Sequence, residues 1–397
     1  MKNVIIRLIN LICSISIKII NIFFPKQKNI VLIGGWFGKR FADNSKYLYL
    51  YLNENKDKYK LNKVIFVTRD KEVYRYLRNN LNYEVYMMYS LKSIYYHLIA
   101  KFYIIDQSPT KDLLGYLGIN SIKINLWHGF PLKKVGYKKT AQKIVQLGNW
   151  QNSYFLTCSE FGGKILGEAF KCPKERRIKG MYPRNYYLLN NIKLLEEREK
   201  IIIDKLHKIR KKNKKIIIYL PTFRDKEKLK FLGIDSEKRL NKFFSFLNEN
   251  NYFFITKVHF AGTDIIKKNR DNICIFNENF LNLDSDMDIY SILKQTDILI
   301  TDYSSVYFDY LYLNKDIIFY PYDLEYYINN DRGLFFNYNE ITPGNKVYNI
   351  NELENVLKNL KDSRDEFEIE RKNILLKCFE SYTLDRTVRN ILNIKEI

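Results

Sequence analysis

The feature that most constrains the fold of this chain is a regular alternation between short apolar runs and longer amphipathic segments. KNIVLIGG (residues 28–35), KVIFVTR (63–69) and SIKINLWHG (121–129) have the length and β-branched content of buried strands. Helical patterns at residues 43–55 and 71–80 follow the first two of them. Strands that alternate with helices predict a parallel sheet with helices on both faces.

The alternation is interrupted once and then begins again. Residues 188–215 are highly charged and end in RKKNKK, and strand patterns recur at residues 215–225 and 252–260. The chain therefore predicts two Rossmann-like domains, which we place at residues 28–195 and 196–397. Two such domains that face a cleft bind ligands at the carboxyl ends of their strands.

The first 24 residues, MKNVIIRLINLICSISIKIINIFF, have a helical pattern of their own. Their polar residues are spaced by three or four positions: Asn3, Arg7, Asn10, Ser14, Lys18 and Asn21. The longest run without a charge, Leu8 to Ile17, is shorter than the roughly 20 residues of a membrane span. We expect residues 1–27 to form an amphipathic helix in a membrane interface, and the alternative is a helix that packs on the protein's own core.

The charge of the chain points to an anionic partner. Lys and Arg number 66 against 44 Asp and Glu, which gives a net charge of +22. Nucleic acid, a membrane surface and phosphorylated substrates all fit such a charge. Because the sequence lacks a basic and aromatic recognition motif, we expect no nucleic acid among the partners. It also lacks G-x-G-x-x-G and G-x-x-x-x-G-K-[ST], which disfavours dinucleotide binding and P-loop hydrolysis.

Polar side chains collect just after the predicted strands. They are His128, Arg184, Asn185, Thr222, Arg224, Lys257, His259, Ser304 and Ser305. Arginine can bind two phosphate oxygens at once, lysine supplies a point charge, and a neutral histidine can take a proton from a hydroxyl. Ser304 and Ser305 precede a helical segment, where they either cap the helix or bind an anion with its free N–H groups. This set predicts phosphoryl or glycosyl transfer from an activated nucleotide donor.

A possible metal site lies in LDSDMD, residues 283–288. Its two overlapping Asp-x-Asp patterns could bind Mg²⁺ or Mn²⁺. The segment also precedes a short helical pattern, where aspartate is a favoured capping residue. We favour the capping role and predict a reaction without a metal or another cofactor.

Five motifs, in this order, identify a family. WHGFPLKKVG (127–136), YPRN (182–185), PTFRD (221–225), KVH (257–259) and TDYSSVYFD (301–309) resemble those of the CDP-glycerol glycerophosphotransferases of teichoic acid and capsule synthesis. The resemblance extends from about Asn29 to the C-terminus. It implies an α/β fold of the GT-B class, with an N-terminal acceptor domain and a C-terminal CDP-donor domain that flank a central cleft. It also implies a peripheral location on the cytoplasmic face of the bacterial cell membrane.

The resemblance also implies roles for individual residues. His128 is expected to be the base that deprotonates the acceptor hydroxyl, and His259, together with Lys257, to stabilise the phosphate. The substrate-binding residues implied are Gly129, Pro131, Arg184, Asn185, Thr222, Arg224, Lys257, Ser304, Ser305 and Asp309. For Asp309, packing of its helix is the alternative.

Three positions depart from the family pattern. Phe130 stands where threonine is common, Tyr186 where aspartate usually follows P-R-N, and Phe260 where proline is frequent. We expect these side chains to reshape a substrate pocket, which leaves the identity of the transferred alditol open.

The expected reaction is an attack on the β-phosphate of CDP-glycerol by an acceptor hydroxyl, with release of CMP. The acceptor would be a polyprenyl-diphosphate-linked sugar or a growing polymer at an anionic membrane surface. Three alternatives stay open. The donor could be CDP-ribitol, or the chain could be a GT-B glycosyltransferase that uses a nucleotide sugar and releases a nucleoside diphosphate. The third, which we disfavour, is a non-enzymatic basic protein that binds nucleic acid or lipid.

Overall fold

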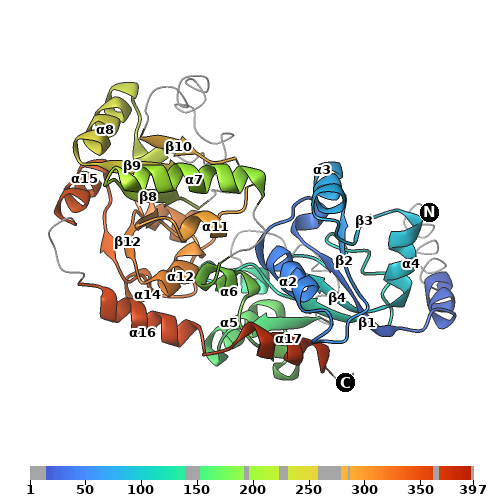
Figure 1. Cartoon of the computed structure of the whole chain (residues 1–397). Coiled ribbons are helices and arrows are strands. Elements are labelled where there is room, and N and C mark those ends of the chain that lie inside the picture. Colours follow the sequence, from blue (N-terminus) through green and yellow to red (C-terminus); the bar gives the residue numbers. More distant parts are fainter. Residues whose placement is uncertain are drawn as a thin grey trace, which may run out of the picture. The chain divides into compact units, whose positions relative to one another are not determined.

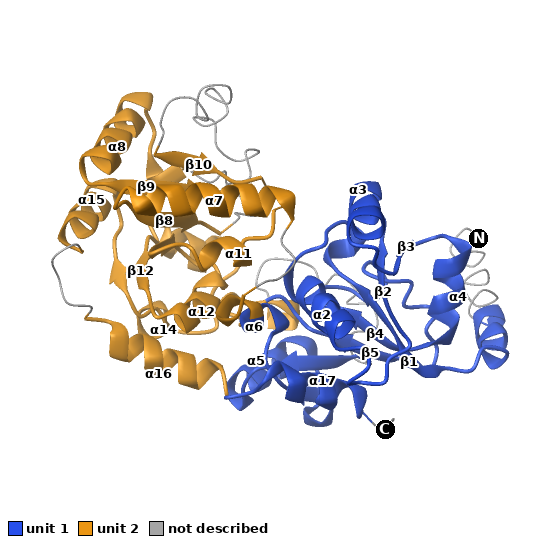
Figure 2. Cartoon of the chain, viewed as in Figure 1, with its two compact units in different colours: residues 1–128, 146–186, 381–397 blue, residues 129–145, 187–380 orange. Residues whose placement is uncertain are grey.

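The computed structural model describes residues 15–138, 153–191, 196–222, 231–257, 279–284, 287–360 and 366–394 (Figure 1). Residues 1–14 of the predicted amphipathic helix lie outside these ranges, as do Arg224, His259 and Phe260. The chain forms two compact units (Figure 2). The first comprises residues 1–128, 146–186 and 381–397, and the second comprises residues 129–145 and 187–380.

The sequence predicts one division of the chain near residue 195, whereas each unit is built from several separate segments of the chain. The last helix, α17 (Leu384–Leu392), belongs to the first unit. There the Met181 N–H donates a hydrogen bond of 2.8 Å to Oγ1 of Thr387. Residues 129–145 belong to the second unit, where the Phe335 N–H donates to the Leu132 carbonyl at 2.9 Å. Contacts between segments far apart in the sequence therefore decide the membership of each unit.

The first unit contains a seven-stranded sheet in which every neighbouring pair is parallel. Its strands are β1 (Gln27–Gly34), β2 (Lys63–Thr68), β3 (Val85–Met87), β4 (Ala100–Ile105), β5 (Ile122–Asn125), β6 (Tyr154–Thr157) and β7 (Arg177–Lys179). The strand order β3-β2-β1-β4-β5-β6-β7 reverses direction beside β1. Ligands of doubly wound sheets bind at such a switch point, outside the carboxyl ends of the strands.

Two helices of the first unit, α2 (Asp43–Glu54) and α3 (Lys71–Arg75), begin where the sequence predicts them. The unit also contains α4 (Leu91–Ile99) and α5 (Glu160–Phe170), and α6 (Pro183–Leu189) runs from this unit into the second. Asp70, Ser90 and Ser159 cap α3, α4 and α5 by accepting hydrogen bonds from free backbone N–H groups. Central strands such as β1 are buried for most of their length, because helices cover both faces of the sheet.

The second unit repeats this plan with a six-stranded parallel sheet of order β10-β9-β8-β11-β12-β13. The strands are β8 (Lys215–Leu220), β9 (Tyr252–Thr256), β10 (Phe280–Asn282), β11 (Ile298–Thr301), β12 (Asp316–Phe319) and β13 (Asn345–Lys346). The helices are α7 (Glu197–Lys211), α8 (Glu237–Glu249), α11 (Tyr290–Leu293), α12 (Val306–Tyr310), α13 (Leu324–Tyr326), α14 (Tyr338–Ile341), α15 (Ile350–Asn359) and α16 (Glu368–Cys378). The α/β architecture with two parallel sheets is as predicted.

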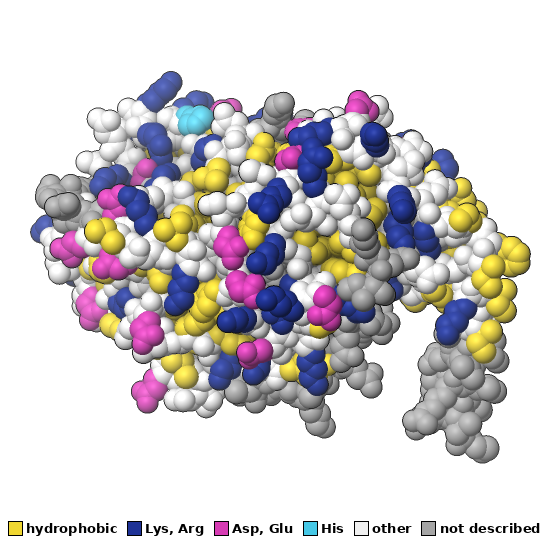
Figure 3. Space-filling view, turned by 90° about the horizontal axis from the view of Figure 1, so that it is seen from below, with side chains coloured by type: hydrophobic (Ala, Val, Ile, Leu, Met, Phe, Trp, Pro, Cys, Tyr) yellow, Lys and Arg dark blue, Asp and Glu magenta, His cyan; other side chains and the backbone are white. Residues whose placement is uncertain are grey.

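The described part of the N-terminal segment is helical over residues 15–22. Its apolar side chains are exposed: Ile22 and the following Phe23 have 77% and 75% of their surface accessible, and Ile15 and Ile19 are also exposed. Figure 3 shows hydrophobic and charged side chains interspersed over one face of the molecule. Phe24 packs on Tyr95 of α4. Among the described residues, no helix combines the length and the apolar character needed to cross a membrane.

Candidate active site

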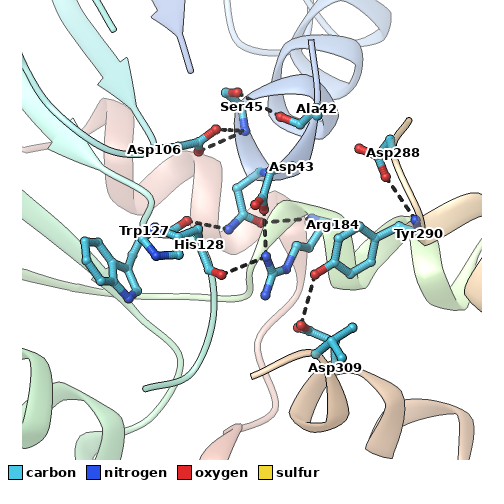
Figure 4. A network of polar contacts seen from close by, with 12 residues as sticks. Ala42, Asp43, Ser45, Asp106, Trp127, His128, Arg184, Asp288, Tyr290 and Asp309 are labelled. Atoms are coloured by element: carbon cyan, nitrogen blue, oxygen red, sulfur yellow. Dashed lines mark hydrogen bonds and ion pairs between the residues drawn. The ribbon is translucent and has the colours of Figure 1, made fainter. Parts of the chain in front are cut away.

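The first unit brings polar residues together at the carboxyl edge of its sheet. Gly35 follows β1, Asp106 follows β4, and Trp127 and His128 follow β5. The amino end of α2, with Asp43 and Asn44, and Arg184 on α6 complete the group (Figure 4). His128 therefore lies at the edge where the sequence predicts a catalytic residue.

Hydrogen bonds on both sides hold the turn that carries His128. The Trp127 N–H donates to Oδ1 of Asn125 at 2.8 Å, and its carbonyl accepts from Nδ2 of Asn44 at 2.7 Å. Gly129 has a φ of +136°, a conformation that side chains with a Cβ rarely adopt. The indole ring of Trp127 lies against the imidazole of His128, with ring centroids 4.1 Å apart. The imidazole is thus half-buried on a backbone with little freedom.

A buried ion pair supports this turn from the other side. One guanidinium nitrogen of Arg184 contacts Oδ1 of Asp43 at 2.7 Å and donates to the His128 carbonyl at 3.0 Å (Figure 4). The two side chains are only 2% and 9% exposed. The Arg184 N–H also donates to Oδ1 of Asn44 at 3.2 Å. Arg184, which the sequence predicts to bind substrate, contacts the turn that positions His128.

A second carboxyl group, Asp106, is buried beside the first. It accepts hydrogen bonds from the Ser45 N–H at 3.1 and 3.3 Å. Burial raises the pKa of Asp106 well above its usual range, and the nearby charge of Asp43 adds to the shift. A Cβ on Gly35 would lie 2.2 Å from Oγ of Ser45 and 2.6 Å from Oδ2 of Asp106, so only glycine fits there. Asp43 is the carboxyl group that contacts Arg184.

Several buried polar atoms in the described part of the first unit have no hydrogen-bond partner, and two of the groups that carry them adjoin the residues of this site. They are the side-chain amide of Asn185, next to Arg184, and the indole N–H of Trp36. The Trp36 ring centroid lies 6.4 Å from that of His128. An unsatisfied buried polar group costs roughly 1–3 kcal/mol, and such groups are expected where a ligand supplies the missing partner. Both groups therefore favour a ligand-binding site around His128.

In the second unit, Thr222 lies at the corresponding carboxyl edge. Its N–H donates to Oδ1 of Asp302 at 2.8 Å, which joins the ends of β8 and β11. Tyr338 adds a hydrogen bond of 2.9 Å from its hydroxyl to the Asp302 carbonyl. Asp302 therefore has a structural role in holding Thr222.

Ser304 and Ser305 lie next along the chain, and both are half-buried. Ser304 accepts a long hydrogen bond of 3.4 Å from the Val306 N–H, whereas Ser305, the residue before α12, makes no capping bond with its side chain. Asp309 on α12 is fully buried, and its Oδ2 accepts a 3.1 Å hydrogen bond from the Tyr290 hydroxyl (Figure 4). This contact favours the packing role for Asp309.

Lys257 follows β9, and its Nζ donates to the Met287 carbonyl. In the segment considered for metal binding, Asp288 accepts a hydrogen bond of 2.9 Å from the Tyr290 N–H. This contact to the residue two positions on is that of an Asx turn before α11, where Ile289 holds the N-cap position without a side-chain capping bond. Residues 285 and 286 of that segment lie outside the described residues, as do the predicted site residues Arg224 and His259.

Two of the three residues that depart from the family pattern lie among the described residues, and their packing can be stated. Phe130 is buried in the second unit, with ring centroids 4.5 Å from Phe308 and 5.9 Å from Phe379. Its side chain therefore belongs to an aromatic core of that unit. Tyr186 packs edge-on against Tyr51 of α2 at 5.4 Å. Phe260 lies outside the described residues.

Sequence reasoning missed several residues of this site. It gave Asp43 and Asn44 no role in the site, whereas the side chains of both contact Arg184. Asp106 and Trp36 received no role. Their positions could have indicated a role, because both residues come just after a predicted strand. Trp36 follows the glycine pair at the end of β1, and Asp106 directly follows β4.

Comparisons with known proteins give matches over most of this chain. The family model described as CDP-Glycerol:Poly(glycerophosphate) glycerophosphotransferase matches residues 16–394. The teichoic acid poly(glycerol phosphate) polymerase of Bacillus spizizenii is 29% identical over 358 residues, 84% of each chain. The teichoic acid glycerol-phosphate transferase of Staphylococcus aureus is 27% identical over 89% of each chain.

A solved structure shows the same fold. A variant of the wall teichoic acid polymerase TagF aligns with a TM-score of 0.71 at 23% identity, over 92% of this chain and 88% of that one. This likeness, together with the two parallel sheets, confirms the predicted GT-B fold class.

Proposed function

Because this chain belongs to the CDP-glycerol:poly(glycerophosphate) glycerophosphotransferase family, we propose that it transfers glycerol phosphate from CDP-glycerol and releases CMP. The acceptor is a hydroxyl of a lipid-linked sugar or of a growing teichoic acid polymer. The observation that carries the proposal is the turn at Trp127–Gly129. It presents a half-buried histidine at the carboxyl edge of a doubly wound sheet, where such folds bind their ligands.

His128 is the proposed general base. The acceptor oxygen attacks the β-phosphorus of the donor, and a new P–O bond forms as the P–O bond to CMP breaks. The electron pair of the broken bond leaves on the phosphate of CMP, and the hydroxyl proton passes to the imidazole. Such a step depends mainly on positioning and on stabilisation of the phosphate charge. The Asn185 amide and the Trp36 indole N–H, both buried, are available to donate to bound substrate.

The second unit is the proposed donor-binding unit. Ser304 and Ser305 are half-buried beside the start of α12, and we assign their hydroxyls to the pyrophosphate of the donor. Thr222 lies on the neighbouring strand end. Arg224, Lys257 and His259 belong to the same proposed set through the family motifs.

Membrane attachment is the second part of the proposal. Residues 15–22 form a helix, and the exposed apolar side chains of residues 15–23 suit insertion into a membrane interface. We place the protein at the cytoplasmic face of the bacterial membrane, where a polyprenyl-diphosphate-linked acceptor would be presented. Deletion of residues 1–24 should release the protein from anionic vesicles in a sedimentation assay, and unchanged sedimentation would refute this attachment.

Nucleotide release tests the proposed reaction. Purified protein is incubated with CDP-glycerol and, separately, with CDP-ribitol, with a membrane extract as the acceptor source. We expect CMP from CDP-glycerol. CMP from CDP-ribitol alone would keep the reaction class and change the alditol. Release of a nucleoside diphosphate from a nucleotide sugar, with no CMP from either donor, would replace the proposed chemistry by glycosyl transfer.

A further inference from the structure

The loop that follows β1 has an unusual backbone. Trp36 and Phe37 have φ values of +47° and +59°, in the left-handed region that bulky side chains rarely adopt. Hydrogen bonds hold the loop in this conformation. The Phe37 N–H donates to Oδ1 of Asp112 at 2.7 Å, and the Gly38 carbonyl accepts from the Arg69 N–H at 2.6 Å. Backbone strain that is fixed by its surroundings is typical of ligand-binding and catalytic sites.

Three basic side chains lie over aromatic rings around this loop. The pairs, with the distance from the cationic group to the ring centroid, are Arg40 with Trp36 (5.3 Å), Lys111 with Phe37 (5.2 Å) and Arg69 with Tyr89 (5.5 Å). We call these six residues the cationic rim. Phe37, Tyr89, Lys111 and Arg69 are exposed, so the rim is accessible to a ligand. Within the described ranges, none of the three cations forms an ion pair with a carboxylate, which leaves them available to an anion.

The cationic rim begins beside His128 and follows the carboxyl edge of the first sheet. The Trp36 ring centroid lies 6.4 Å from that of His128. Trp36, Arg69 and Tyr89 come just after β1, β2 and β3, and the sheet order runs β3-β2-β1-β4-β5. His128 follows β5, so strand spacings of about 4.8 Å put the two ends of this row about 19 Å apart. That length suits a chain molecule better than a single ion.

Cations distributed along an edge match a ligand that carries phosphates at intervals. Arginine and lysine bind phosphate oxygens, and the aromatic rings beside them can pack on the carbon chain between two phosphates. A poly(alditol phosphate) has both parts, whereas a neutral sugar lacks the charge and inorganic phosphate lacks the carbon chain. Single-stranded nucleic acid binds by stacking its bases on open aromatic faces. Here a cation lies over each ring and competes with a base for that face, which favours the alditol chain.

We propose that the cationic rim binds the phosphodiester chain of the acceptor, behind the hydroxyl that attacks the donor. The inference rests on the proposed function, because it uses His128 as the base that receives the proton of that hydroxyl. Arg40 binds the phosphate nearest to the reacting end, and Lys111 and Arg69 bind phosphates further back. An acceptor that already carries alditol phosphate units is therefore held at several points, with its terminal hydroxyl beside the imidazole.

The test measures binding of the full chain to a lipid-free poly(glycerol phosphate) oligomer that can span the rim, in a calorimeter without donor. We expect Arg69→Gln/Lys111→Gln to weaken binding by at least about tenfold, since two charge-assisted contacts are lost. The control Lys28→Gln/Lys60→Gln removes two exposed lysines at the amino edge of the same sheet and should bind within about twofold of the parent. Tyr89→Leu keeps the charge of the rim and should give a smaller loss in the same direction.

Two further titrations identify the ligand. Inorganic phosphate, and a single-stranded oligonucleotide with as many phosphates as the oligomer, should each bind at least about tenfold more weakly than the oligomer. Equal affinity for either one would overturn the assignment to the acceptor chain. Oligomer binding that is unchanged in the rim variants, or equally weakened in the control, would overturn the rim as the site. Because these titrations contain no donor, failure of this inference is distinct from failure of CMP release.

Discussion

The two units have similar sheets but use their carboxyl edges differently. In the first unit, charged and polar side chains at this edge contact one another, as in the pair of Arg184 with Asp43. In the second unit, Asp302 and Asp309 contact a backbone N–H and a tyrosine hydroxyl, and the serine pair before α12 stays half-exposed. The first edge is suited to fixing one imidazole, and the second is suited to offering hydroxyl groups to a ligand.

The largest expected effect comes from removing that imidazole. His128→Ala should lower kcat for CMP release by about a thousandfold, since general bases contribute roughly 10²–10⁴-fold, while the Kd for CDP-glycerol changes little. Steady-state nucleotide release and calorimetry measure the two quantities. His207→Ala, at an exposed position on α7, is the matched control and should stay within about twofold of the parent. Full turnover by the His128→Ala variant would contradict the assignment of His128 as the general base.

The ion pair of Arg184 with Asp43, which contacts the His128 backbone, should have the next largest effect. Arg184→Met leaves the Asp43 carboxylate buried without its partner, so the free energy of unfolding should fall by roughly 3–5 kcal/mol in urea denaturation. The exposed pair of Lys372 with Glu368 in the second unit provides the comparison, and Lys372→Met should lower the free energy of unfolding by about 1 kcal/mol or less. The double variant Asp43→Asn/Arg184→Met should recover part of the loss. Equal losses for Arg184→Met and Lys372→Met would contradict the contrast between the units.

Acid should destabilise the first unit through His97. Burial lowers the pKa of His97 to about 4, and the ring is held between the Ser93 carbonyl and the Leu114 N–H. A group with a lowered basic pKa stays neutral in the fold but takes up a proton when unfolded. The free energy of unfolding therefore decreases as the pH falls from 6.5 to 4, by about 3 kcal/mol in total.

A variant isolates this effect from other titrating groups. Burial raises the pKa of Asp112 to about 6, which changes stability in the opposite sense over the same pH range. His97→Gln keeps the Asp112 contribution and removes that of the imidazole. Urea denaturation at several pH values should show a smaller loss of stability on acidification in the variant. Parallel curves for the two proteins would exclude His97 as the cause.

The smallest expected effect concerns the second unit. Ser304→Ala/Ser305→Ala should raise the KM for CDP-glycerol about tenfold or more with little change in kcat, because each hydroxyl bound to a charged phosphate contributes roughly 1–3 kcal/mol. Ser90→Ala is the control, because Ser90 caps α4 with a hydrogen bond. It should lower stability by about 1 kcal/mol and leave KM unchanged. If the serine pair behaves like Ser90, its role is capping alone.

The sequence predicts the alternating elements and the edge on which His128 lies. This is possible because strands that are buried on both faces have continuous apolar sequences. It does not predict the partner of Arg184. Asp43 lies 141 residues away, and nothing in its local pattern distinguishes an ion-pairing residue from a helix cap. Phe130 shows the same limit, since a side chain beside a catalytic motif belongs to an aromatic core formed by distant residues. Long-range pairing therefore accounts for most of what the sequence left undetermined.

The length of β4 keeps the two ends of the first sheet apart. Lys101 and Asp106 lie at the two ends of this strand, five residues apart, which corresponds to about 17 Å at 3.3 Å per residue. Substitutions more than about 10 Å apart that share no partner change the free energy of unfolding additively. A substitution at the amino end of β4 is therefore an internal reference for one at its carboxyl end, because the two effects on stability should simply add.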